Sequence, residues 1–185
     1  RAGDLRGILN GVDTGIWNPA TDPALAAGYA ANRLAAKRAN KTALQAEMGL
    51  EVCADRPLFG VISRLTHQKG LDLLLTVGAG LAQLPAQLAV LGSGDKAMEA
   101  GFRELAERFP GQIAVRIGFN EDLAHRIEAG ADCFVMPSRF EPCGLNQMYS
   151  LRYGTPPIVR ATGGLADTVV DVGSDTLDNK TANGF

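Results

Sequence analysis

Short apolar runs alternate with longer amphipathic stretches over the last two thirds of the chain. The runs are rich in Val, Ile and Phe and lack polar alternation, a pattern typical of strands buried on both faces of a parallel sheet. They cover residues 58–62, 88–91, 113–115, 133–136 and 157–159. The stretches that follow the runs space their apolar residues as helices do, at 71–84, 96–109, 123–129, 145–153 and 165–172. This alternation predicts an α/β fold with a doubly wound parallel sheet.

The residues before this alternation follow a different pattern. Ile8 and Leu9 form an apolar pair that is too short to define a strand. Residues 26–48 are Ala-rich with a polar face, which predicts one helix, and Gly49 follows as a C-terminal glycine does. Read alone, this segment is a connector that leads into the α/β domain.

The composition is that of a globular protein, because 46% of the 185 residues are hydrophobic and 21% are charged. A formal net charge of −2 excludes a polybasic nucleic-acid binder by bulk charge and leaves a local basic site open. Three cysteines, an odd number, disfavour a disulfide scaffold and favour a reducing compartment. No apolar run is long enough to span a bilayer. The chain starts with Arg1 and stops at Phe185 without an obvious finishing element, so we expect a fragment of a longer protein.

Ligands of open parallel sheets bind beyond the carboxyl ends of the strands, so the residues after each apolar run are the candidates for chemistry. Arg64 and Lys69 follow the first run and are predicted to share one strand-to-helix loop. They are either two solvated surface charges or a diphosphate clamp, in which Arg binds in bidentate fashion and Lys acts as a point charge. Cations beside a helix N-terminus oppose the helix dipole, which favours the clamp.

The second and third runs are followed by weaker signals. Residues 92–95 (GSGD) predict a tight strand-to-helix turn capped by Asp95. Phe119 comes directly after the third strand and is either a stacking platform for a base or a core residue.

The densest cluster, residues 137–145 (PSRFEPCGL), follows the fourth run. Glu141 lies on a loop that leads to a helix, where a carboxylate either caps the helix or meets an oxygen-rich ligand; the flanking Pro142 and Gly144 favour a ligand site. Cys143 is better explained as a small packed residue than as a nucleophile.

Two glycines and a threonine follow the fifth run and open a helix. Thr162, Gly163 and Gly164 are either an anion or hydroxyl site or a capped turn. No spaced His, Cys and Asp cluster occurs, so we expect no metal, and a bound diphosphate would be neutralised by Arg64, Lys69 and helix dipoles.

Three long motifs carry a family resemblance: residues 63–70 (SRLTHQKG), 138–145 (SRFEPCGL) and 162–169 (TGGLADTV). With residues 7–13 (GILNGVD) and 17–22 (WNPATD), they resemble the bacterial glycogen synthases and plant starch synthases, which are retaining enzymes that use ADP-glucose. The resemblance runs from near Leu5 to the end of the chain and keeps the order and spacing of the motifs.

The resemblance implies the GT-B fold, two doubly wound domains with donor and acceptor in the cleft between them. Residues 55–185 would be the Rossmann-like C-terminal domain that binds the nucleotide sugar, and residues 1–54 the end of the N-terminal domain with the connector. The implied reaction transfers glucose from ADP-glucose to the non-reducing end of an α-1,4-glucan, with no metal or other cofactor. The implied location is the bacterial cytoplasm or, as the alternative, a plastid, with neither nucleic acid nor membrane as a partner.

The resemblance also assigns roles to residues. Arg64 and Lys69 match the pair that neutralises the leaving diphosphate, and Glu141 matches the carboxylate near the transferred glucose. The other donor-binding positions are Phe119 against adenine, the loop residues Cys143, Gly144, Leu145 and Asn146, and Thr162, Gly163 and Gly164 near the donor phosphate and sugar.

Two positions depart from the wider pattern. Tyr149 occupies the place of a second Glu that related enzymes carry, as expected for this subfamily, and Asn146 replaces a Thr that is frequent in bacterial members. The Lys-x-Gly-Gly-Leu motif of the N-terminal domain does not occur in the chain. The alternatives are a nucleotide-binding module without catalytic activity and a nicotinamide-dependent oxidoreductase, which the lack of a G-x-G-x-x-G fingerprint disfavours.

Overall fold

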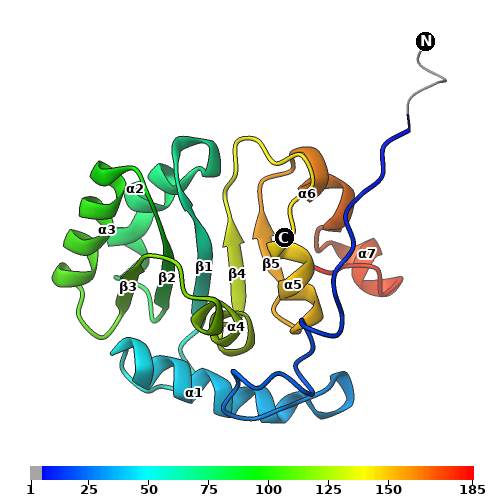
Figure 1. Ribbon diagram of the computed structural model, residues 1–185, viewed down its shortest axis with the longest axis horizontal. Coiled ribbons are helices and arrows are strands. Elements are labelled where there is room, and N and C mark those ends of the chain that lie inside the picture. The colour runs from blue at the N-terminus through cyan, green and yellow to red at the C-terminus, as the bar shows by residue number, and fades with distance from the viewer. Residues whose placement is uncertain (1–5) are drawn as a thin grey trace.

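A single parallel sheet of five strands forms the centre of the computed structural model, which describes residues 6–185 (Figure 1). The strands are β1 (Leu58–Leu65), β2 (Gln87–Gly94), β3 (Ile113–Ile117), β4 (Cys133–Met136) and β5 (Pro157–Val159), in the order β3-β2-β1-β4-β5. All neighbours pair in parallel. Each predicted strand is present, and the predicted doubly wound sheet is confirmed. The first five residues of the predicted connector, including Leu5, lie outside the described residues.

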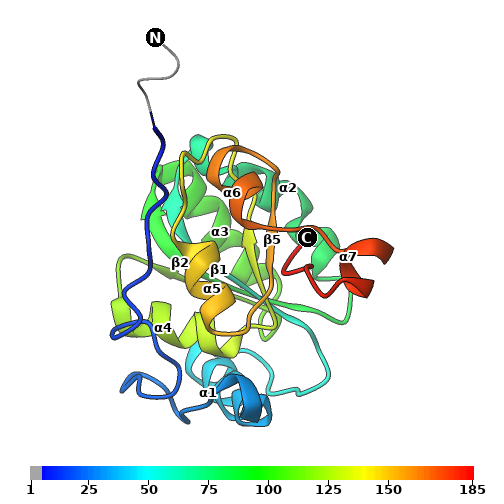
Figure 2. The ribbon, with the colours of Figure 1, turned by 90° about the vertical axis from the view of Figure 1, so that its right-hand side faces the viewer.

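Helices cover both faces of the sheet (Figures 1 and 2). On one face the core contains side chains of α1 (Lys37–Met48), α4 (Glu121–Gly130) and α6 (Gly163–Thr168); on the other it contains those of α2 (Leu71–Leu81) and α3 (Lys96–Arg108). The remaining helices are α5 (Asn146–Arg152), α7 (Ser174–Asp178) and the 3-10 turns η2 (Ala31–Ala36) and η3 (His67–Lys69). Along β2, Leu88 and Val90 join one core while Ala89 and Leu91 join the other. This explains why the strands are continuously apolar.

The strand ends differ from the prediction. β1 and β2 each continue three residues beyond the apolar run, because their backbones stay paired as far as Leu65 and Gly94. α6 ends at Thr168 instead of reaching 172, and Val169 has extended backbone angles. Because backbone pairing does not depend on apolar side chains, the hydrophobic pattern underestimates the length of strands that continue into polar residues and glycine.

The predicted single helix over residues 26–48 is wrong in its first part. The α-helix begins at Lys37, after a 3-10 turn in which Arg33 has non-helical angles (φ −141°, ψ 47°). Asn40 explains the difference, because its side chain accepts a hydrogen bond from the Ala27 N–H (3.1 Å) and donates one to the Ala27 carbonyl (2.7 Å). A continuous helix would separate these residues by about 20 Å along its axis. The predicted end is correct, since Gly49 caps the helix with φ 74°.

Helix α1 packs into the core of the sheet. Leu44 is fully buried and Met48 nearly so, in the same cluster as Ile127 of α4 and Leu58 of β1. The division of the chain at residue 54 stays a prediction. No helix between residues 6 and 185 combines the length and the apolar character needed to cross a bilayer.

A buried carboxyl group lies where α1 meets α4. Glu128 is fully buried, and neither of its carboxylate oxygens has a hydrogen-bond partner among residues 6–185. Burial raises the pKa of Glu128 well above its usual value. The nearby Lys37 ammonium donates instead to the carbonyls of Glu128 (3.2 Å) and Ala129 (2.6 Å) and to the Thr155 hydroxyl (2.7 Å). Burial also lowers the pKa of Lys37, to about 8. Glu128 therefore ionises at a higher pH in the folded chain than a solvent-exposed glutamate does.

Replacing Glu128 by Met is expected to stabilise the protein much more near pH 8 than near pH 5. Because the folded-state pKa is raised, the unfolded chain ionises first, and stability falls as the pH rises above about 4.3. The fall is about 1.4 kcal/mol for each pH unit until the pH passes the folded-state pKa. Thermal unfolding of the full-length protein between pH 5 and pH 8 measures this effect. Exposed Glu104, replaced by Met, is the control; an equal gain at both pH values would contradict the expectation.

Candidate functional site

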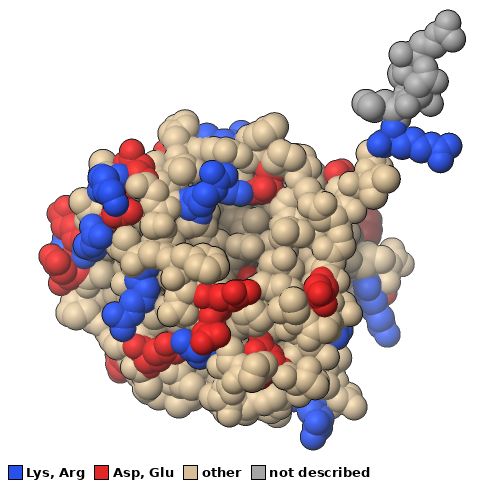
Figure 3. Space-filling view, viewed as in Figure 1, with Lys and Arg blue, Asp and Glu red and all other residues tan. Residues whose placement is uncertain are grey.

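A cavity of about 430 Å³ opens at the carboxyl ends of β1 and β4. These adjacent central strands are the point at which the strand order reverses, because the chain leaves β1 towards β2 and leaves β4 towards β5. Ligands of doubly wound folds bind at such a point. Figure 3 shows this face of the molecule hollowed, with basic side chains at the rim. The lining includes seven of the predicted site residues: Arg64, Lys69, Glu141, Cys143, Gly144, Leu145 and Asn146.

The two predicted cations reach the cavity from different elements. Arg64 lies within β1 and not on the following loop, which corrects the prediction that both cations share a loop. It is exposed and makes no ion pair or side-chain hydrogen bond within residues 6–185. Lys69 ends the 3-10 turn η3 after that strand. Both line the same cavity, so the structure brings the two charges to one site.

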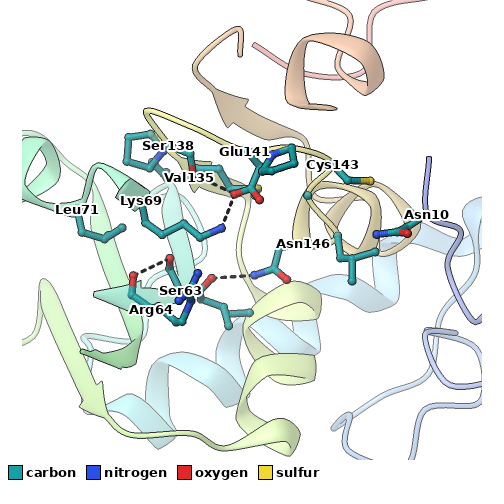
Figure 4. A pocket seen from close by; sticks show the side chains of 16 residues that line it. Asn10, Ser63, Arg64, Lys69, Leu71, Val135, Ser138, Glu141, Cys143 and Asn146 are labelled. Atoms are coloured by element: carbon teal, nitrogen blue, oxygen red, sulfur yellow. Dashed lines mark hydrogen bonds and ion pairs between the residues drawn. The ribbon is translucent and has the colours of Figure 1, made fainter. Parts of the chain in front are cut away.

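Glu141 is held by two donors at the cavity wall. Its Oε2 atom accepts from the Lys69 ammonium and from the Ser138 hydroxyl, which lies 3.2 Å away. Glu141 is 7% exposed and Ser138 is 2% exposed, so this triad is largely shielded from water. Figure 4 shows Lys69 pointing across the cavity towards Glu141. Oε1 of Glu141 and two N–H groups of Lys69 are left to meet a ligand.

The loop that carries Glu141 is tied to the turn that carries Lys69. Arg139 binds Asp72 in α2 through two hydrogen bonds of 2.6 and 2.7 Å and also donates to the His67 carbonyl (2.8 Å). The hydrogen bond from Arg139 lowers the pKa of Asp72 to about 2. Gly70 has φ 68°, and a Cβ atom there would lie 2.0 Å from the carbonyl oxygen of Pro137. The two loops therefore approach so closely that only glycine fits at residue 70.

The loop before α5 presents backbone donors to the cavity. The N–H groups of Gly144, Leu145 and Asn146 have no acceptor within residues 6–185. The Asn146 side chain donates to the Ile62 carbonyl at 2.8 Å, which ties the start of α5 to β1 (Figure 4). Half-buried Cys143 lines the cavity with a free thiol. A phosphate here would meet backbone N–H groups as well as the two cations.

A second cavity of about 240 Å³ adjoins the first. The two share the lining residues Ile62, Ser63, Arg64 and Asn146. Phe119 lines the second cavity and is 89% exposed, so it is not the core residue that the sequence left as an alternative. An exposed ring beside a cation-lined cavity suits stacking on a base. The contact with adenine itself stays a prediction.

The residues after β5 lie outside both cavities. Thr162 precedes α6, and the Gly164 N–H donates to the Glu141 carbonyl at 3.0 Å. A Cβ atom on Gly163 would lie 2.2 Å from that same carbonyl oxygen. These glycines therefore support the Glu141 loop from behind, and their direct contact with a donor stays a prediction.

Ser138 and Asn10 are among the lining residues that had no assigned role in the sequence. Ser138 belongs to the densest motif, and a hydroxyl three residues before Glu141 was the available signal. Asn10 reaches the cavity from the N-terminal segment, far from every strand end. No local pattern identifies Asn10, because only the fold places that segment beside the cavity.

No group of three or more His, Cys, Asp or Glu residues that could hold a metal ion occurs in the described part of the chain. The charged groups that face the cavity from residues 6–185 are Arg64, Lys69 and Glu141.

The family model of glycosyl transferases group 1 matches residues 50–177. Two bacterial proteins named glycogen synthase match the whole chain: that of Dechloromonas aromatica at 84% identity and that of Nitrosomonas eutropha at 63%. The chain spans 38% and 37% of the length of these relatives.

Among solved structures, the catalytic domain of starch synthase IV from Arabidopsis thaliana, bound to ADP and acarbose, matches all of the chain with a TM-score of 0.92 and 41% identity. The chain covers 38% of that structure. Together with the bacterial relatives, this match confirms the resemblance to glycogen and starch synthases that the motifs predict.

Proposed function

Since the chain belongs to the group 1 glycosyl transferases, we propose that the full-length protein transfers glucose from ADP-glucose to an α-1,4-glucan. The glucose is added at the non-reducing end, with retention at the anomeric carbon. One observation carries the proposal: a cavity lined by Arg64, Lys69 and Glu141 adjoins a second cavity lined by the exposed ring of Phe119. In a nucleotide sugar the diphosphate joins the sugar to the nucleoside, so the cations suit the diphosphate, Glu141 suits the sugar and Phe119 suits the base. The likeness to the starch synthase with bound ADP supports it.

The charged groups at the cavity can stabilise the charges that develop when the bond between the sugar and the diphosphate breaks. Cleavage of a glycosyl–phosphate bond builds negative charge on the leaving diphosphate and positive charge on the sugar. The Arg64 guanidinium and the remaining N–H groups of Lys69 bind the negatively charged diphosphate. Oε1 of Glu141 either stabilises the positive charge on the sugar or accepts a hydrogen bond from a sugar hydroxyl. The free backbone N–H groups of residues 144–146 add to the stabilisation of the phosphate. We infer that the reaction needs no metal, because these groups supply the neutralising charge.

The number of carboxylates at the cavity indicates how the reaction retains the configuration at the anomeric carbon. Glu141 is the one carboxylate among the described residues that line the cavity, and both of its donors hold Oε2. Retaining glycosidases that act by double displacement use two carboxylates, one as the nucleophile and one as the acid and base. We therefore propose a reaction on one face of the sugar: the acceptor oxygen bonds to the anomeric carbon, the bond to the diphosphate breaks, and the acceptor proton passes to a diphosphate oxygen.

The compartment proposed for the protein is the bacterial cytoplasm. Three free cysteines, Cys53, Cys133 and Cys143, suit a reducing compartment, and the relatives named above are bacterial. The donor half of the site lies in this chain, and the glucan is proposed to bind mainly to the part of the protein that this chain does not contain.

The full-length protein is expected to bind ADP more tightly than UDP and to elongate glycogen from ADP-glucose. Titration calorimetry with both nucleotides measures the preference, and transfer of radiolabelled glucose to glycogen measures the activity. Tighter binding of UDP would overturn the choice of donor. Binding of ADP without any transfer would favour the alternative, a nucleotide-binding module without catalytic activity.

A further inference from the structure

A buried glutamine lies behind the loop that carries Cys143 and Gly144. Gln147 of α5 is fully buried and lines neither of the two cavities. Its Nε2 atom donates to the carbonyl of Cys143 at 3.0 Å and to that of Gly144 at 3.2 Å. The Gln147 amide therefore holds two consecutive carbonyl groups of the loop from inside the protein.

The N–H groups of the same two peptide units belong to residues at the cavity. The Cys143 carbonyl shares its peptide unit with the Gly144 N–H, and the Gly144 carbonyl shares its unit with the Leu145 N–H. In a planar trans peptide the C=O and N–H bonds point in opposite directions. Gly144 and Leu145 line the first cavity, and neither N–H has an acceptor within residues 6–185. By holding the two carbonyls, Gln147 sets the direction in which both N–H groups point.

The backbone of this loop has the shape of an anion-binding turn. Gly144 has φ 73°, in the left-handed region, and Leu145 has φ −120° and ψ −37°. Successive N–H groups in such a turn form a concave surface that binds anions. A Cβ atom on residue 144 would lie 2.3 Å from Oε1 of Gln147, so the close approach of the glutamine requires glycine there.

The surroundings of Gln147 determine the orientation of its amide. Nε2 also donates to the Thr168 hydroxyl at 3.1 Å, and that hydroxyl donates to the Gly164 carbonyl at 2.6 Å. The reverse orientation would place Oε1 against the two loop carbonyls, which can only accept. Oε1 itself is buried and has no hydrogen-bond partner within residues 6–185, which costs stability. Packing alone therefore does not explain a glutamine here, whereas its hydrogen bonds to the loop do.

We propose that Gln147 is a positioning residue that orients the Gly144 and Leu145 N–H groups towards the diphosphate and sugar of the donor. The inference rests on the proposed glucose transfer. Donors that are fixed before the reaction stabilise the charge on the leaving diphosphate without having to reorganise. Gly144 and Leu145 line the first cavity and not the second, so Gln147 acts on the diphosphate and the sugar and not on the nucleoside.

Gln147→Met in the full-length protein keeps the length of the side chain and removes both N–H donors. We expect kcat/KM for transfer from ADP-glucose to fall by about 10- to 100-fold, the range that misplaced donors cause. Affinity for ADP, measured by titration calorimetry, should fall as well. Inhibition by adenosine, which has no phosphate, should stay close to that of wild type. Unchanged transfer, or an equal loss of affinity for ADP and adenosine, would overturn the proposal.

Gln147→Glu separates orientation of the loop from packing. A carboxylate cannot donate to the two carbonyls, whereas a protonated carboxyl group donates one hydrogen bond. Burial favours the protonated form, so transfer relative to wild type at the same pH should rise about threefold or more from pH 8 to pH 6. The same ratio for Gln147→Met should not change with pH. A ratio for Gln147→Glu that stays constant, or that follows that of Gln147→Met, would overturn the proposal.

A second buried amide provides the matched control. Gln45 of α1 is also fully buried, donates to the Cys53 carbonyl at 2.9 Å and lines neither cavity. Gln45→Met should leave transfer by the folded protein unchanged. If Gln147→Glu does not fold, the adenosine and ADP affinities of Gln147→Met decide the question. Inactivity of the wild type would overturn the proposed glucose transfer itself, whereas these affinities test Gln147 without any transfer.

Discussion

The purified 185-residue chain is expected to bind ADP weakly and to transfer no glucose to glycogen. The predicted site residues that line the cavities all come from one domain, and two of them, Arg64 and Phe119, are exposed. Water at such a surface screens the charges that must stabilise the leaving diphosphate. The acceptor hydroxyl is also no longer held near the anomeric carbon, and positioning supplies about 7–11 kcal/mol of a barrier. Either loss alone is expected to reduce transfer severely.

The measurement is incorporation of radiolabelled glucose from ADP-glucose into glycogen by the isolated chain. The full-length protein at the same concentration is the positive control, and binding of ADP with a cooperative thermal transition shows that the isolated chain is folded. Elongation above the level without enzyme would contradict the expectation. It would mean that the residues of this chain are sufficient for transfer, or that two copies of the chain associate to form a complete site.

Arg64→Ala and Lys69→Ala in the full-length protein are each expected to reduce glucose transfer by about 10- to 150-fold. Each variant removes a charge-assisted contact to the diphosphate, and such contacts contribute about 1.5–3 kcal/mol. The structure predicts different effects on stability. Arg64 is exposed and unpaired within residues 6–185, so its loss should leave thermal unfolding unchanged. Lys69 is the ion-pair partner of the buried Glu141, so its loss should also lower the unfolding temperature.

Steady-state transfer assays and thermal unfolding of the three proteins measure both effects. Arg38→Ala removes one exposed positive charge on α1, away from both cavities, and controls for the change in net charge. Near-normal transfer by either site variant would indicate that the residue is a solvated surface charge and not part of a diphosphate clamp. Equal stability of Lys69→Ala and wild type would contradict the importance of the ion pair with Glu141.

Several features of the site follow from local sequence. A strand covered by helices on both faces is apolar along its covered part, so the five apolar runs are sufficient to identify the parallel sheet. The carboxyl ends of such strands meet at one edge, so Arg64, Phe119 and Glu141 were predictable as neighbours of one ligand. Asp95 also caps α3 as predicted, with its Oδ1 accepting from the N–H groups of Ala97 and Met98 at 3.0 Å.

Other features depend on contacts between residues far apart in the chain. The helix predicted over residues 26–48 begins only at Lys37, because Asn40 binds the backbone of Ala27. Gly163 and Gly164 pack against the loop that carries Glu141, a contact that no local pattern reveals, and the anion site predicted there stays a prediction.

The sequence by itself determined the sheet, the edge that carries the site and the three charged residues there, because these depend on the pattern of neighbouring residues along the chain. Only the tertiary structure decided how those residues act together. It paired Lys69 with Glu141 across 72 positions and brought Asn10 from the N-terminal segment to the same cavity. It also stacked Trp17 between α4 and α5. The physical reason is that packing and hydrogen bonding act through space, so the partner of a side chain is set by the fold and not by its neighbours in the chain.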